Sequence, residues 1–164
     1  MLVSRIGVSD AEALRDIRLE ALMRHPEAFS RDLEMESALS SGEWRTTIAE
    51  RAWFVCRDDD RWAGIAAFAR NRASKKTAHV GSLGAMYVRN AWRGKGAGDK
   101  LVMAVIAHAA GEVEQLVLTV NAENGPAIAL YERHRFAVYG RIPRSIKIGE
   151  RYYDELEMIR VELP

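Results

Sequence analysis

The chain has 164 residues, of which 48% are hydrophobic and 29% charged, with a formal net charge of +1. This balance is ordinary for a globular protein and gives no support to nucleic-acid or membrane binding, so we expect neither. Cys56 is the only cysteine, which excludes an intrachain disulfide and favours a reducing, cytoplasmic location. Residues 1–10 lack a secretory pattern, and no apolar run approaches the roughly 18–20 residues of a membrane span.

The first part of the chain predicts one strand and two helices. Residues 2–6 form a short strand, and apolar side chains at helical spacing predict a helix from about residue 10 to residue 23, before Pro26. Residues 27–40 are acidic and predict irregular structure. A second helix is expected over residues 41–50.

Strands and helices alternate in the rest of the chain. Strands are expected over residues 53–57, 62–70, 77–88, 115–120, 136–141 and 152–163, and helices over residues 99–110 and 124–135. The resulting order, β-α-α-β-β-β-α-β-α-β-β, is typical of a mixed α/β domain.

The most informative stretch is Arg93-Gly94-Lys95-Gly96-Ala97-Gly98, which joins a predicted strand to a predicted helix. Its glycines let the backbone approach a ligand closely, and the first N–H groups of the following helix have no partner within that helix. The helix dipole and the charges of Arg93 and Lys95 add positive potential at the same place. The stretch therefore predicts an anion site suited to a phosphate group.

The charge around this loop is expected to be positive. Residues 70–100 carry eight basic side chains and one acidic side chain, Asp99. A positive field of this kind would neutralise a polyanionic cofactor. For Arg72, Lys75 and Lys76, a solvated basic hairpin is an equally good interpretation.

Two common phosphate motifs fail at one position. Both the P-loop and the dinucleotide-binding pattern require a glycine where this chain has Asp99. The spacing Arg93-x-x-Gly96-x-Gly98 instead resembles the acetyl-CoA signature of the GNAT superfamily of N-acetyltransferases. Residues 86–89 before the loop, Met-Tyr-Val-Arg, are similar to a strand of that family.

A second segment carries the same resemblance. Residues 116–136, LVLTVNAENGPAIALYERHRF, are similar to the strand, loop and helix that follow in the GNAT family. The two motifs cover about residues 77–141, and the order of elements extends the resemblance to the whole chain. It implies a single N-acetyltransferase domain over residues 1–164. The fold would be α/β (α+β), with a central mixed, mostly antiparallel sheet of about seven strands and about four helices.

The resemblance implies an enzyme that uses acetyl-CoA as co-substrate, without a metal, and transfers its acetyl group to a primary amine by direct attack in a ternary complex. The implied cofactor-binding residues are Met86, Tyr87, Val88, Arg93, Gly94, Lys95, Gly96, Ala97, Gly98, Asn124, Ala127 and Tyr131. The main chain of Met86 and Val88 would pair with pantetheine, and Asn124 would bind the same arm. Tyr131 would be the catalytic acid that protonates the CoA thiolate.

The chain departs from the family where the helix after Asn124 ends. The family usually has a glycine there, in the left-handed conformation, and this chain has His134-Arg135. If Arg135 adopts the left-handed conformation of that glycine, it lowers the stability of the protein. Alternatively the helix ends differently, and Arg133 or Arg135 reaches the cofactor phosphates.

The general base and the acceptor are not identified by the sequence. His79, Glu155 or a water molecule are the alternatives for the base, whereas His108 is expected to be structural and His25 receives no role. The acceptor pocket is expected between residues 25–40 and a loop at 141–153, lined by Phe29, Trp44, Tyr152 and Tyr153. A solvated acidic face is the favoured interpretation of Asp32, Glu34 and Glu36.

Two other classes of function stay open. One is a non-catalytic domain that binds or senses acyl-CoA, and the other is a nucleotide-binding module. The acceptor amine could belong to a small amine, an amino acid, an antibiotic or a protein. The resemblance also makes a homodimer a possible assembly.

Overall fold

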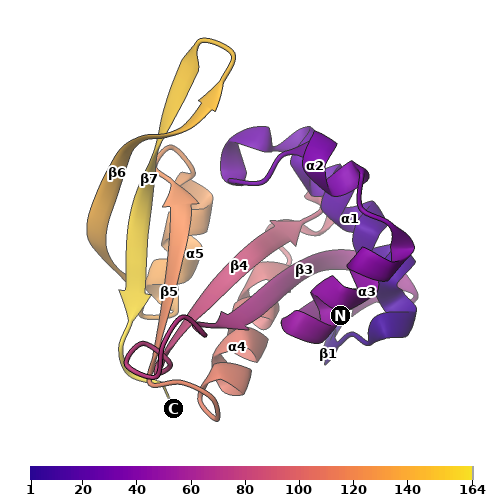
Figure 1. The fold of residues 1–164 in the computed structure, drawn as a ribbon, viewed down its shortest axis with the longest axis horizontal. Coiled ribbons are helices and arrows are strands. Elements are labelled where there is room, and N and C mark those ends of the chain that lie inside the picture. Colours follow the sequence, from indigo (N-terminus) through magenta and orange to yellow (C-terminus); the bar gives the residue numbers. More distant parts are fainter. Residues whose placement is uncertain (164) are drawn as a thin grey trace.

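One seven-stranded sheet with helices packed on it forms the core of the protein (Figure 1). The computed structural model describes residues 1–163. The strands are β1 (Leu2–Arg5), β2 (Ala52–Asp58), β3 (Arg61–Arg70), β4 (Val80–Val88), β5 (Gln115–Asn121), β6 (Ala137–Ile148) and β7 (Arg151–Arg160). The α-helices are α1 (Ala11–Arg24), α2 (Leu33–Ser37), α3 (Ser41–Glu50), α4 (Ala97–Ala109) and α5 (Gly125–Arg133).

The order of strands in the sheet is β1-β2-β3-β4-β5-β7-β6. The pair β4 and β5 is parallel, with α4 in the connection between them, and every other neighbouring pair is antiparallel. This confirms the predicted α/β fold with a mixed, mostly antiparallel sheet. The described residues contain five α-helices instead of about four, because α2 forms within the stretch expected to be irregular.

Both faces of the central strands are buried. Phe54 and Cys56 of β2 belong to one apolar cluster together with residues of α4. Trp53 and Val55, which alternate with them, belong to a second cluster with residues of α1 and α3. A strand covered on both faces explains why residues 52–56 are apolar without alternation.

Local hydrogen bonds explain the additional helix. The side chain of Asp32 caps α2 by accepting a hydrogen bond from the Met35 N–H at 2.8 Å. Glu36, one turn later, is buried against the side chains of Arg18 and Arg31. Glu36 is therefore not part of the solvated acidic face that the sequence favoured.

The last two strands form a long hairpin, which reaches beyond the end of β5 (Figure 1). Gly149, with φ of 57°, lies in the turn that joins β6 to β7. Residues 141–153 are consequently hairpin and not the loop expected from the sequence. None of the helices within residues 1–163 has the length and apolar character needed to cross a bilayer.

Candidate active site

The site begins where β4 and β5 separate. The two strands pair over three positions only, from Val80 opposite Gln115 to Ser82 opposite Val117. Beyond Ser82 they diverge, and a cavity of about 1010 Å³ extends from this gap to α1 on one side and to the N-terminus of α4 on the other. Unpaired strand edges present free N–H and C=O groups, so this gap is suited to an extended ligand.

The glycine-rich loop supplies free amides at one end of the cavity. Gly94 and Gly96 have φ of 70° and 83°, which favours glycine at both positions. Gly96 is the N-cap of α4 and has no side chain that could cap the helix. The first backbone hydrogen bond of the helix is donated by the N–H of Lys100 to the carbonyl of Gly96. The N–H groups of residues 97–99 thus lack helical partners. Together with the helix dipole they form a site for an anion.

The acidic residue beside this loop is neutralised. Asp99 lies in the first turn of α4, and its Oδ1 is 3.2 Å from Nη2 of Arg133 and 3.1 Å from Nε2 of His134. Burial raises the pKa of Asp99, but these hydrogen bonds outweigh burial and the net pKa is lowered. The pairing with Arg133 weakens the repulsion that Asp99 would exert on a phosphate. It also engages Arg133, which the sequence left as a possible phosphate contact.

The structure brings most of the predicted cofactor residues to this one cavity. Those that line it are Met86, Tyr87, Val88, Arg93, Gly94, Gly96, Gly98, Asn124, Ala127 and Tyr131. Lys95 and Ala97 are not among the lining residues: Lys95 is exposed, and Ala97, the first residue of α4, is buried in the core. Ala97 can contribute its backbone N–H, whereas Lys95 donates its own N–H to the Trp92 carbonyl at 3.4 Å.

The backbone of β4 faces the gap at alternate residues. Arg89 donates its N–H to the carbonyl of Ala63, and Val88 lies opposite Gly64 in the register. Because alternate residues of an antiparallel strand direct their polar groups to opposite sides, the N–H of Val88 points away from β3. The Val88 carbonyl accepts a hydrogen bond from Nε of Arg93 at 2.9 Å. The backbone N–H of Val88 is therefore free to donate a hydrogen bond to a ligand, whereas its carbonyl is already engaged.

Helix α5 places a tyrosine in the wall of the cavity. Asn124 caps the helix, because its Oδ1 accepts a hydrogen bond from the Ala127 N–H at 3.2 Å. Tyr131 lies two turns further on the same face, lines the cavity and is 5% exposed. Burial raises the pKa of Tyr131, so its hydroxyl stays protonated at neutral pH.

The same helix ends as the family pattern requires, without the glycine. Arg135 has φ of 62°. The Phe136 N–H donates to the Tyr131 carbonyl at 3.1 Å and the Arg135 N–H donates to the Glu132 carbonyl at 2.9 Å. These two bonds define a Schellman motif with an arginine at the left-handed position. The rings of Tyr131 and Phe136 pack edge to face across it, 5.9 Å apart.

Glu155 and His25 are among the side chains lining the cavity that can accept a proton. Glu155, on β7, is buried there and accepts a hydrogen bond from the Ser145 hydroxyl. His25, at the end of α1, has Nε2 2.8 Å from Nη2 of Arg93 and was assigned no role from the sequence. His79 is exposed, precedes β4 and does not line the cavity, so the structure does not bring this candidate base to the site.

The acceptor end of the cavity differs from the sequence expectation. Phe29 lines it as predicted. Trp44 does not, because this residue of α3 is buried in the core cluster with residues of α1 and β2. Neither Tyr152 nor Tyr153 on β7 is among the lining residues. Asn121 is a lining residue that the sequence reasoning missed; its Nδ2 donates to the carbonyl of Glu27 at 3.0 Å.

Comparison with known proteins decides the family. Residues 12–136 match the model of the acetyltransferase (GNAT) family. The chain belongs to this family. The N-acetyltransferase resemblance inferred from the two motifs is thereby confirmed, and the protein is an acyltransferase.

Several relatives resemble this acetyltransferase. It is 29% identical over 118 residues to YwnH of Bacillus subtilis (strain 168), whose name assigns it provisionally to the phosphinothricin acetyltransferases; the match covers 68% of this chain and 70% of YwnH. It is 25% identical over 168 residues to the L-amino acid N-acetyltransferase AaaT of Escherichia coli (strain K12), covering 99% and 98% of the two chains. The structure of yncA from Salmonella typhimurium, solved with its cofactor acetyl-CoA, has the same fold, with a TM-score of 0.84, 20% identity and coverage of 98% of this chain and 93% of that one.

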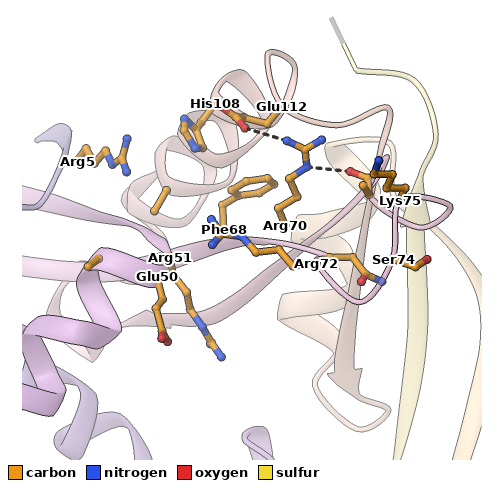
Figure 2. Close-up of a pocket in the computed structure, with 14 residues that line it drawn as sticks. Arg5, Glu50, Arg51, Phe68, Arg70, Arg72, Ser74, Lys75, His108 and Glu112 are labelled. Carbon is orange, nitrogen blue, oxygen red and sulfur yellow. Dashed lines mark hydrogen bonds and ion pairs between the residues drawn. The ribbon is translucent and has the colours of Figure 1, made fainter.

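A second cavity of the acetyltransferase, of about 520 Å³, is lined by basic residues of the hairpin between β3 and β4 (Figure 2). Arg70, Arg72 and Lys75 line it together with Arg5 and His108. None of those three lines the cavity between β4 and β5. The structure therefore does not bring Arg70, Arg72 or Lys75 to the cavity at the glycine loop.

Proposed function

We propose that this protein transfers the acetyl group of acetyl-CoA to a primary amine by direct attack in a ternary complex. The observation that carries the proposal is the continuity of one cavity. It runs from the free amides at the N-terminus of α4, along the open edge of β4, to the side chain of Tyr131. A molecule with a diphosphate at one end and a thioester at the other matches this sequence of groups.

The loop would hold the diphosphate. The N–H groups of residues 97–99 and the conformation of Gly94 and Gly96 suit phosphate oxygens, and Arg93 adds a positive charge at the cavity wall. The N–H groups of Met86 and Val88 would pair with the pantetheine amides as an additional strand does. Ala127 and the cap residue Asn124 would contact the same arm from α5.

The chemistry follows from the groups around the thioester. The amine must lose a proton before it attacks, and Glu155 or His25 would take that proton directly or through water. A β4 N–H would stabilise the negative charge on the carbonyl oxygen as it develops. The carbon–sulfur bond then breaks, and Tyr131 would give its proton to the departing thiolate.

Two measurements test the proposal. Purified protein mixed with acetyl-CoA and a panel of primary amines should release free thiol only when an amine is present. Saturable binding of acetyl-CoA without thiol release would favour the non-catalytic acyl-CoA-binding alternative. In thermal unfolding, CoA should raise the melting temperature more than ATP or NAD does, and the opposite order would favour a nucleotide-binding module.

A further inference from the structure

A buried arginine with an unused donor lies at the acceptor end of the cavity. Arg18 of α1 is 5% exposed and lines the cavity. Its Nε and Nη2 donate to the two carboxylate oxygens of Glu36 at 2.9 and 3.0 Å. Its Nη1 is buried and has no hydrogen-bond partner within residues 1–163. Because a buried N–H without an acceptor is destabilising, this atom favours binding of an acceptor atom that enters the cavity.

The charges around Arg18 leave an excess of positive charge. Arg31 donates from Nε to the same carboxylate at 3.1 Å, so Arg18 and Arg31 share a single negative charge from Glu36. Arg51 lines this cavity as well, and Figure 2 shows its side chain extending away from His108. Glu27 and Glu155 also line the cavity, and the carboxylate of Glu27 is 3.4 Å from Nδ1 of His25. Arg18 and Arg31 thus bring two positive charges to one carboxylate.

The orientation of the guanidinium is fixed before any ligand binds. The two bonds to Glu36 hold the plane of Arg18 in a bidentate arrangement. The ring of Phe29 covers that plane, with its centroid 4.5 Å from Cζ of Arg18. A donor held in this way loses little entropy when it binds an anion.

We propose that the acceptor is a small amine that carries a carboxylate, of the α-amino acid class, and that Nη1 of Arg18 donates a hydrogen bond to that carboxylate. The proposal rests on the acetyl transfer proposed above and names its substrate class. Lysine side chains and N-termini of proteins have no carboxylate beside the amine and would leave Arg18 unpartnered. A carboxylate both satisfies Nη1 and neutralises the excess charge.

The first test uses the wild-type protein and pairs of substrates. Free α-amino acids are compared with their own α-carboxamides, which keep the primary amine and the side chain and lack the negative charge. The ratio of kcat/KM for acid over amide should be about 10 to 100 for the best pair. Equal rates for acids and amides would overturn this proposal and leave acetyl transfer intact. Absence of thiol release from every pair would overturn acetyl transfer, and this proposal with it.

The second test assigns the preference to Arg18. Arg18→Lys keeps the charge and loses the planar fork, so the acid-to-amide ratio should fall to within about threefold of one. Arg15→Lys, on the exposed face of α1, is the matched control and should keep the wild-type ratio. The ratio does not depend on the fraction of folded enzyme. If Arg18→Lys does not fold, the double variant Arg18→Met with Glu36→Leu removes the buried pair together. A wild-type ratio in either Arg18 variant would overturn the assignment.

Discussion

Replacing Arg135 by glycine should stabilise the protein. Arg135 ends α5 in the left-handed conformation, with φ of 62°, and its side chain is exposed. The backbone at this position makes the two hydrogen bonds of a Schellman motif, so it is fixed by the fold and not by the side chain. A residue with a Cβ is strained in that conformation, and glycine is not.

The size of the effect follows from two opposing terms. The left-handed conformation costs an L-residue about 1–2 kcal/mol. Glycine in turn loses about 0.5–1 kcal/mol through the greater freedom of the unfolded chain. The net stabilisation is about 0.5–1 kcal/mol, which for a chain of this size raises the melting temperature by about 1–4 °C.

The assay is thermal or urea-induced unfolding of wild type, Arg135→Gly and Arg135→Ala. The alanine variant removes the charge and keeps the strain, so it should lie within about 0.5 kcal/mol of wild type. The alanine variant also controls for the loss of charge repulsion between Arg135 and Arg160, whose pKa is lowered by burial and by the charge of Arg135. A glycine variant no more stable than the alanine variant would refute the reasoning.

Two further predictions concern the site. In steady-state kinetics, Tyr131→Phe should lower kcat by up to about 100-fold, while the KM for acetyl-CoA changes less than about twofold. Full activity of this variant would exclude Tyr131 as the acid. Since burial raises the pKa of Tyr131, kcat of the wild type should show no alkaline loss from this group up to about pH 10. Asp99→Asn should lower the melting temperature at pH 7. Because the folded pKa of Asp99 is lowered, that difference should shrink as pH falls below about 4, and a difference independent of pH would contradict the pairing with Arg133.

The parts of the site that local geometry determines were predictable from the sequence. The glycines of residues 94–98 require a left-handed backbone or close approach, and the helix after them follows from apolar spacing. Asn124 and Tyr131 are separated by two helical turns, so their common face could be read directly. The mixed, mostly antiparallel sheet needed the family resemblance as well, because pairing between distant strands leaves little local signal.

The parts that depend on contacts between distant residues were not predictable. Glu36 has the sequence context of an exposed acidic residue, and its burial follows from a partner, Arg18, on another helix. His25 and His79 are both single histidines in polar surroundings, and the fold alone brings His25 to the cavity. The basic hairpin is close to the glycine loop in sequence, but the length of β4 carries it to the second cavity.

Calorimetric titration of acetyl-CoA into wild type and Gly96→Val tests the central claim most directly. Gly96 has φ of 83°, and no atom lies within 4 Å of the position that a Cβ would occupy there. Valine at this residue therefore acts on the backbone conformation of the loop and not on packing. Wild type should bind one equivalent of acetyl-CoA with saturable heat. The valine variant, if its circular dichroism spectrum is unchanged, should bind at least about 100-fold more weakly, because the amides of α4 no longer meet the diphosphate. Equal affinity in the two proteins would contradict the account.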